Sequence, residues 1–486
     1  MTLAFAPAAH AVDWRFEPYL NASATYTDNA RQSSNNPQNA LILTETPGFT
    51  LHSEGSRRVQ ASLQYGLTGV ERIGNDQNND LYHNLNAVGK AELVKDFLFI
   101  DGNAHISQEL ISLFGSPADA TVNNSNRTTV GVYSISPYIQ QRLGTFAFAQ
   151  ARYTASRAIF QNNVAPNANS NSFATSLKSG TRFTDLNWGL NYSITKTQNR
   201  SALNSAYNTD VTFESASATV GYALTRRFRV FGTVGHDSND YLSSTGTSGS
   251  FYSAGFGWSP TRLTSVEASV GERYFGRTYS FSGSHRTRLT RWTLRYSEDV
   301  SDISRLVTNY NDLQQVHWSC PASAQAILPG NATVYDLLNA GCQVDSFQFG
   351  SSVEAGVFIS KLLTGGVTWQ LGKADVSVTL SDLTRQYQLV QAQDRVQRAS
   401  GLIQYHLTPI ITANGGLSFI RNSSGGVLTG GLARADDIMI LDFGINRRFT
   451  NKLNGALTFR RTQRTSNVAN ADYDEDSITA SVNMRF

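Results

Sequence analysis

Apolar and polar residues alternate with a period of two in one segment after another, from about residue 14 to the end of the chain. In 186–195, LNWGLNYSIT, large apolar residues occupy every second position and polar or small residues fill the others. The segments 100–107, 147–154 and 292–297 follow the same rule. Successive side chains of a β-strand point to opposite faces, so each segment predicts a strand with one apolar and one polar face. Strict alternation over about ten residues, repeated many times, is typical of transmembrane β-barrels.

The connections between these expected strands alternate in length. Short turns on one side and long loops on the other are the outer-membrane arrangement, in which the short turns face the periplasm and the long loops the outside. The sequence therefore predicts an all-β, antiparallel transmembrane barrel of about 22 strands, within a range of 18 to 24. The expected turns lie at 53–56, 94–96, 143–145, 224–227, 259–262, 407–409 and 449–451, and the expected loops at 28–39, 72–80, 111–126, 158–170, 198–210, 238–250, 423–432 and 463–476.

Composition supports this interpretation against the other classes of protein. The chain has 486 residues, which would suggest two or three soluble domains, but only 16% are charged and it contains 20 Tyr and 26 Phe. Many aromatics with little charge argue against disorder, and an apolar face almost free of Lys and Glu argues against a soluble sandwich or propeller. A net charge of +3, without a basic run, does not favour nucleic acid as a partner. We expect one barrel domain, 12–486, in the outer membrane of a Gram-negative bacterium, with membrane lipid as its partner.

The two ends of the chain carry targeting signals. Ala9-His10-Ala11 has the small-x-small pattern of a signal-peptidase site, so residues 1–11 are interpreted as the remainder of a signal peptide; a plain flexible N-terminus is the alternative. The last ten residues, SITASVNMRF, place an apolar stripe on one face and end on Phe486. We expect this segment to be the closing strand, paired with the first strand so that no edge remains in the membrane. Phe486 resembles the terminal signal that the barrel assembly machinery recognises.

The stretch 301–356 interrupts the alternation. It contains Cys320 and Cys342, the two cysteines of the chain, and an even pair in an exported protein predicts a disulfide. A buried free pair is the alternative, and metal binding is disfavoured because His317 is the one nearby histidine. The stretch is expected to be a long extracellular loop that either forms an external lid or enters the lumen as a plug.

No motif in the sequence indicates an enzyme. The haem-attachment, zinc-protease, nucleophile-elbow and Walker patterns are missing from the printed sequence, so we expect no catalytic residue, metal or cofactor. The polar face instead predicts charged residues that line the lumen. Such charges hold water and set solute preference, but an Arg paired with a carboxylate would equally brace a wide barrel, and both roles stay open. The candidates are Asp101, His105, Arg152, Glu267, Arg273, Arg286, Arg288, Arg295, Arg385, Asp442 and Arg460.

Several strand segments resemble one protein family over nearly the whole chain. EPYLNASATYTDNA, AELVKDFLFIDGNAHISQ and SISPYIQQRLGTFAFAQARYT are similar to the PEP-CTERM system-associated outer-membrane proteins, as are ETPGFTLHSEGSRR and the long run 249–300. The resemblance does not extend to the cysteine-containing stretch and supplies no binding residues. It implies a place in the cell envelope beside exosortase-type sorting and exopolysaccharide synthesis.

These observations lead to an expected function. The chain is expected to be a non-enzymatic conduit for exopolysaccharide secretion across the outer membrane, with the polysaccharide and periplasmic export proteins as further partners. Inward arginines such as Arg273, Arg286, Arg288 and Arg295 would attract an acidic glycan weakly and repeatedly. The alternatives are a porin for small solutes and a structural or assembly barrel that does not conduct.

Overall fold

The structure, a computed structural model, describes most of the chain from residue 12 onward. It covers 12–486 except 75–77, 116–121, 123–124, 162–164, 201–208, 245, 303–304, 306–317, 320–342, 345–355, 391 and 427–432. The expected signal remnant, residues 1–11, and both cysteines, Cys320 and Cys342, lie outside the described residues. The proposed disulfide therefore stays a prediction.

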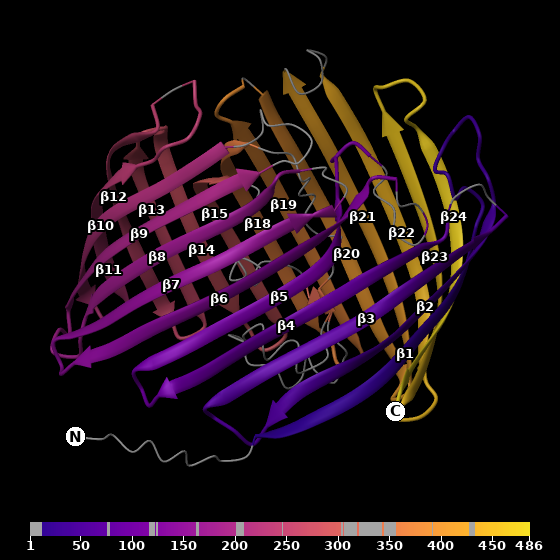
Figure 1. Cartoon of the computed structure of the whole chain (residues 1–486), viewed down its shortest axis with the longest axis horizontal. Helices are drawn as coiled ribbons and strands as arrows, with labels where there is room; N and C mark the ends of the chain where they lie inside the picture. The colour runs from indigo at the N-terminus through magenta and orange to yellow at the C-terminus, as the bar shows by residue number, and fades with distance from the viewer. Residues whose placement is uncertain are drawn as a thin grey trace.

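In the described part of the chain, 22 strands form one closed antiparallel sheet (Figure 1). This confirms the predicted fold and strand number. Each of the 22 strands pairs with the barrel strands before and after it, and β15 pairs with β18 because β16 and β17 lie outside the barrel sheet. The strands are β1 (Asp13–Thr27), β2 (Ala40–Glu54), β3 (Val59–Ile73), β4 (Asp80–Val94), β5 (Leu98–Leu110), β6 (Arg127–Leu143), β7 (Ala147–Phe160), β8 (Asn167–Ser179), β9 (Leu186–Arg200), β10 (Thr209–Thr225), β11 (Phe228–Ser238), β12 (Ser248–Thr261), β13 (Thr264–Arg273), β14 (Gly276–Arg286), β15 (Thr290–Asp302), β18 (Val357–Gln370), β19 (Ala374–Tyr387), β20 (Ala392–Thr408), β21 (Ile411–Gly426), β22 (Arg434–Arg448), β23 (Leu453–Ser466) and β24 (Tyr473–Arg485).

The stretch between β15 and β18 adds a small separate element. Two short strands, β16 (Trp318–Ser319) and β17 (Gln343–Val344), pair antiparallel with each other and not with the barrel. Among the described residues, no helix is long and apolar enough to cross a bilayer.

The first and last strands close the barrel. β1 pairs with β24 in a continuous register from Tyr19 opposite Arg485 to Thr27 opposite Ser477. Beyond the last paired residue, the backbone N–H of Phe486 donates to the carbonyl oxygen of Pro18 at 3.0 Å. The closing role expected for the C-terminal segment is therefore confirmed, and the sheet leaves no unpaired edge at this seam.

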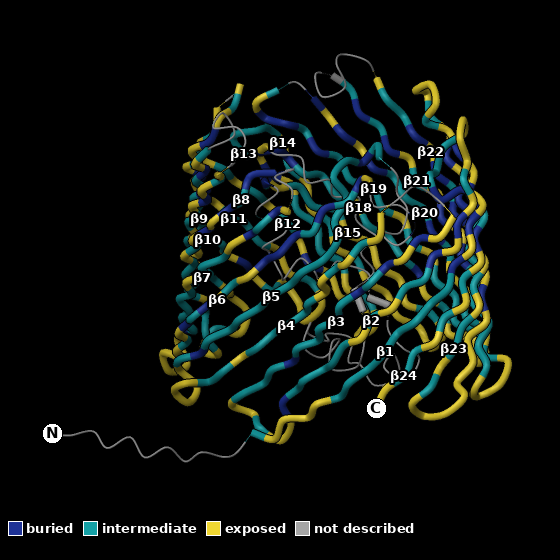
Figure 2. The backbone as a smooth tube through the Cα atoms, turned by 45° about the vertical axis from the view of Figure 1, so that its right-hand side comes forward, coloured by how far each residue is buried: buried dark blue, intermediate teal, exposed yellow. Residues whose placement is uncertain are grey.

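The wall of the barrel has one strongly apolar face, which explains the alternation in the sequence. In β22, Leu441, Phe443 and Ile445 are exposed at 40%, 56% and 43%, and they alternate with Ile440, Asp442 and Gly444. Exposed and less exposed residues alternate in the same way along other strands, most regularly in β12 (Figure 2). A face rich in exposed large apolar side chains is stable in contact with lipid, as the wall of an outer-membrane barrel requires.

On the other face, aromatic rings pack over glycines. The Tyr19 ring of β1 lies across Gly48 of β2 and Gly66 of β3, and the Tyr19 hydroxyl donates to the Tyr65 carbonyl at 3.2 Å. A Cβ atom at Gly48 would lie 2.4 Å from the Tyr19 ring. Only a residue without a side chain fits beneath the ring, so this glycine serves close packing across three strands.

Candidate functional site at the outer mouth

A segment between β5 and β6 crosses the barrel interior at the loop end. We call residues 111–115 the strap. Asn422 of β21 donates to the Leu113 carbonyl at 2.7 Å, and Arg464 of β23 donates to the Phe114 carbonyl at 2.7 Å. In the sheet, β5 and β6 are not neighbours of β21 or β23, so these contacts span the mouth. Side chains that hold the strap therefore face the lumen, which identifies the inner face of β21, β22 and β23.

Two arginines that share one buried carboxylate hold the strap. Asp436 is fully buried and lies 2.5 Å from Arg464 and 3.4 Å from Arg434, and it also accepts from the Ser466 hydroxyl at 2.5 Å. Arg434 donates to the Phe114 carbonyl at 2.9 Å, and its guanidinium lies 4.9 Å from the centre of the Phe114 ring. Hydrogen bonds from charged donors are stronger than neutral ones, and the low polarity of a buried site strengthens them further. We call Asn422, Arg434, Asp436 and Arg464 the latch.

A second segment, between β11 and β12, reaches the opposite part of the rim. Ser244 donates its backbone N–H to the carbonyl of Gln388, just beyond β19, at 2.9 Å, and its hydroxyl donates to the same oxygen at 3.1 Å. Tyr241 of this segment exchanges a hydroxyl hydrogen bond of 2.9 Å with Tyr274, in the turn between β13 and β14. Burial raises the pKa of both tyrosines, so both hydroxyls stay protonated at neutral pH. With the strap, this segment narrows the mouth.

The strand register shows which residues in the rest of the wall lie on the same face as the latch. Directly opposed residues of neighbouring strands lie on the same face of a sheet, and every second residue of a strand does too. Asp442 and Arg460 lie an even number of residues from Asp436 and Arg464, and they are opposed in the β22–β23 ladder. They therefore face the lumen with the latch, and the Arg460 Nε lies 2.6 Å from the Asp442 carboxylate.

The same reasoning places most of the other predicted lumen residues on the inner face. They form separate ion pairs around the wall and do not meet in one site. Arg273 bridges Asp237, which is 1% exposed, and Asp299, and its guanidinium also lies 5.2 Å from the centre of the Phe275 ring. The remaining pairs are Arg152 with Asp101 at 2.8 Å, Arg385 with Asp394 at 3.4 Å, and Glu267 with Arg229.

Four further predicted lumen residues lie on β5, β14 and β15 or in the turn after β14. His105 lies on the inner face of β5, four residues after Asp101. Arg295 lies on the inner face of β15, and Arg286 is the last residue of β14. Arg288 does not belong to the wall, because β14 ends at Arg286 and Arg288 lies in the short turn before β15. The alternation had suggested a strand position for Arg288, and its role in the lumen stays a prediction.

The latch was not among the predicted functional residues. Arg434, Asp436 and Arg464 lie on the polar face near strand ends. There the alternation predicts which face a residue lies on, but not which residues it contacts. Their partner, Phe114, lies 350 residues from Arg464 in a loop that has no periodic pattern. Among the described residues, no group of three or more His, Cys, Asp or Glu side chains is placed to hold a metal ion. The mouth is therefore a polar surface of arginines, carboxylates and aromatic rings.

Comparisons with known proteins found similarity in structure and not in sequence. No family model matches the chain, and no curated protein matches it in sequence. The solved structure of the siderophore receptor PirA from Acinetobacter baumannii is similar, with a TM-score of 0.54 and 8% identity over 98% of this chain and 81% of that one. The FrpB iron transporter from Neisseria meningitidis has a TM-score of 0.51 and 11% identity over 98% and 83%. PirA from Pseudomonas aeruginosa has a TM-score of 0.50 and 10% identity over 97% and 80%.

These comparisons bear on location and on the expected function. The chain is a 22-stranded outer-membrane barrel of the kind found in Gram-negative receptors, as predicted for its location. The expected role in exopolysaccharide secretion is contradicted, since the similar structures are receptors and transporters for siderophores and iron. The physical reason for the error is that a polar lumen suits any hydrophilic solute and carries no information on the direction of transport.

Proposed function

We propose that this chain is a non-enzymatic outer-membrane receptor that takes up a ligand from the outer medium through its barrel. The observation that carries the proposal is the latched strap. A general porin needs a mouth that is open at rest, whereas here Ile111 to Gly115 cross the interior and are held by buried, charge-assisted hydrogen bonds. A mouth of this kind favours controlled entry of a bound ligand.

The chemistry of the mouth supports a hydrophilic ligand. Arg273 lies between two carboxylates, with aromatic rings of Phe251 and Phe275 5.5 and 5.2 Å from its guanidinium. Tyr241 and Tyr274 add hydroxyl groups beside it. Aromatic faces together with a few placed polar groups are the usual composition of a small-molecule site. Because the similar structures are described as siderophore receptors and an iron transporter, ferric chelates are the first ligands to test.

Ligand binding to the purified barrel tests the proposal directly. A panel of ferric chelates is titrated against the protein in detergent, and saturable binding is expected for at least one chelate and for none of its iron-free forms. Arg273→Gln should weaken that binding, whereas Arg447→Gln, at the periplasmic end of β22, should not. Absence of binding across a broad panel of chelates and other solutes would contradict a receptor.

Conductance in planar bilayers separates a receptor from an open pore. The unmodified barrel should conduct weakly, and Arg464→Gln should raise the conductance because the strap loses two of its hydrogen bonds. Arg461→Gln is the matched control, since Arg461 lies three residues before Arg464 on the outer face of the same strand, where it pairs with Asp476. A large, steady conductance of the unmodified barrel would identify a porin and refute the proposal.

We also propose that the chain belongs to the PEP-CTERM system-associated outer-membrane family, on the strength of the strand segments quoted above. Family membership is separate from the export role, which is not retained. Its test is the set of neighbouring genes: exosortase-type sorting and polysaccharide synthesis genes beside this one would support membership, and their absence across several genomes would argue against it.

A further inference from the structure

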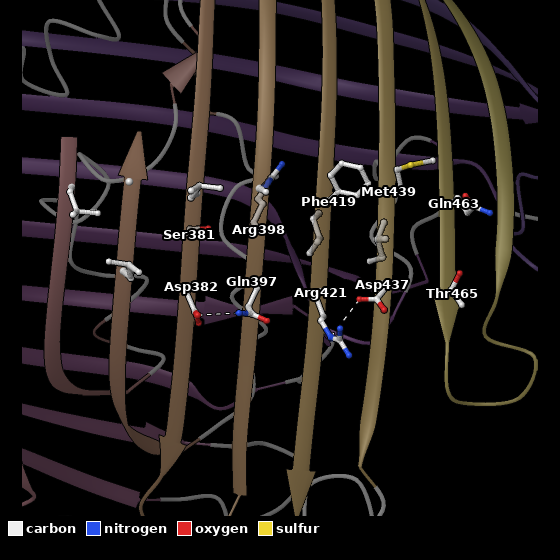
Figure 3. A pocket seen from close by; sticks show the side chains of 17 residues that line it. Ser381, Asp382, Gln397, Arg398, Phe419, Arg421, Asp437, Met439, Gln463 and Thr465 are labelled. Atoms are coloured by element: carbon white, nitrogen blue, oxygen red, sulfur yellow. Dashed lines mark hydrogen bonds and ion pairs between the residues drawn. The ribbon is translucent and has the colours of Figure 1, made fainter. Parts of the chain in front are cut away.

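The outer wall carries a hollow that the uptake function does not use. It measures about 580 Å³ and lies across β15 and β18 to β23, from the middle of these strands toward their extracellular ends (Figure 3). Its lining residues Phe419, Met439 and Asp437 lie an odd number of residues from latch residues on the same strands, so they face away from the lumen. The hollow therefore opens toward the lipid.

Register divides the lining into two adjacent rows. In the apolar row, Leu380 of β19 is opposed to Ala399 of β20, Ala399 to Phe419, and Phe419 to Met439. In the charged row, two residues closer to the loops, Asp382 is opposed to Gln397, Gln397 to Arg421, and Arg421 to Asp437. The wall thus changes from apolar to charged within one step of about 7 Å along the strands. Such a step is expected where the hydrocarbon layer meets the headgroups.

The shape of the hollow follows from the small residues of the apolar row. Gly365 of β18 lies between Leu294 of β15 and Leu380, and Ala399 lies between Leu380 and Phe419, so each leaves space between larger neighbours. A space of this kind, apolar and open toward the membrane, fits a segment of an acyl chain. Burying acyl carbons against these side chains contributes in proportion to the apolar area covered.

The charged row and its neighbours present both cationic and acceptor groups. Arg421 and Asp437 form a loose ion pair at 3.7 Å, and both side chains are 59% exposed (Figure 3). Arg395 binds Asp382 with two hydrogen bonds of 2.9 and 2.5 Å, and Gln397 donates to the same carboxylate at 3.2 Å. A guanidinium recognises phosphate, and carboxylate and amide oxygens accept hydrogen bonds from sugar hydroxyls.

We infer that this hollow binds a phosphorylated glycolipid of the outer leaflet. One acyl chain lies in the apolar row, the headgroup phosphate contacts Arg421, and the sugar hydroxyls donate to Asp437 and to the Asp382–Gln397 pair. A headgroup with phosphate alone would leave the two carboxylates facing an anion. The alternation of acid, amide, base and acid therefore favours a headgroup that has both phosphate and hydroxyl groups.

Retention of lipid by the full-length barrel tests the inference. The protein is purified in mild detergent, incubated with diphosphorylated lipid A or with phosphatidic acid, whose headgroup is a phosphate alone, stripped by washing, and examined by native mass spectrometry. The unmodified barrel should retain lipid A in preference to phosphatidic acid. Arg421→Gln should weaken lipid A retention about tenfold, the loss expected for one charge-assisted hydrogen bond. Gel electrophoresis of unheated samples, in which a folded barrel migrates differently from an unfolded one, confirms that each variant is folded.

A matched control separates a specific site from general attraction to the wall. Arg157 lies on the outer face near the extracellular end of β7, on the opposite wall of the barrel, so Arg157→Gln removes the same charge elsewhere (Figure 1). Equal retention by the two variants would overturn the inference. Retention of phosphatidic acid equal to that of lipid A would overturn the glycolipid assignment. A change in oligomeric state without a change in lipid would show instead that a second copy of the chain covers the hollow.

Discussion

Arg464 of β23 and Asp436 of β22 meet at 2.5 Å inside the outer mouth, and Arg464 also donates to the Phe114 carbonyl 350 residues earlier in the chain. The side chains of both residues are almost completely buried, at 6% and 1% exposure. A buried charge is stable only when it is paired and hydrogen-bonded. The ion pair and the strap therefore depend on each other: the carboxylate holds the arginines in place, and the arginines hold the strap.

Asp436→Asn should release the strap. The substitution leaves Arg434 and Arg464 without their shared countercharge, and breaking one partner of a buried pair typically costs about 3–5 kcal/mol. The arginines should then turn toward water and lose the strap carbonyls. Limited proteolysis from the outside should cut within 111–126 faster than in the unmodified protein. Asp437→Asn, the adjacent residue on the outer face, is the control; equal cleavage of both variants would contradict the latch.

Inner-face arginines should set ion selectivity, whereas Arg288 should not. In a strap-released Arg464→Gln background, Arg286→Gln with Arg295→Gln should move the reversal potential in a salt gradient toward cation preference, because fixed positive charges are lost from the lumen. Arg288→Gln removes one charge from the turn between β14 and β15 and should leave the reversal potential nearly unchanged. A shift as large for Arg288 as for the pair would contradict the assigned faces.

Gly48→Ala should destabilise the barrel beside its closing seam. The added methyl group would lie 2.4 Å from the Tyr19 ring and from the Tyr65 carbonyl oxygen, so the ring must move and its packing over Gly66 is lost. Overpacking of this kind typically costs about 1–3 kcal/mol. Urea unfolding in lipid vesicles measures the change. Gly401→Ala is the control, because a Cβ there meets no atom within 4 Å, and a comparable loss in both variants would refute the packing argument.

Deletion of Phe486 should reduce assembly more than stability. The Phe486 side chain is 59% exposed, and its backbone contributes one hydrogen bond to Pro18, so little folded-state energy is lost. If the residue is a recognition signal for the assembly machinery, the amount of barrel in the outer membrane should fall sharply, while protein refolded in vitro should unfold at nearly the same urea concentration. Phe486→Tyr, which keeps an aromatic terminus, should assemble. Normal membrane levels of the truncated chain would contradict the signal.

The predictions from the sequence were most accurate for the features that the boundary between lipid and water imposes on every strand. Each strand separates lipid from water, so the face of Asp101, Arg152, Asp442 and Arg460 could be read from alternation alone, and the structure places them with the latch on the inner face. Arg288 lies in a turn and not in a strand, because the alternation of the sequence continues past Arg286 whereas the β14–β15 ladder ends there. The export role was wrong because neither the resemblance nor a polar lumen carries information on the direction of transport.

The sequence by itself determined the barrel, its strand number and the sidedness of its wall, since hydrophobic burial in lipid requires a period of two in every spanning strand. The tertiary structure alone decided which residues meet. Asp436, Arg464 and Phe114 come together across the mouth, and Leu380, Ala399, Phe419 and Met439 align into one row, because closure and register set distances between segments that are remote in the chain. Such contacts depend on the position of one strand relative to another, and no local pattern within a strand specifies that position.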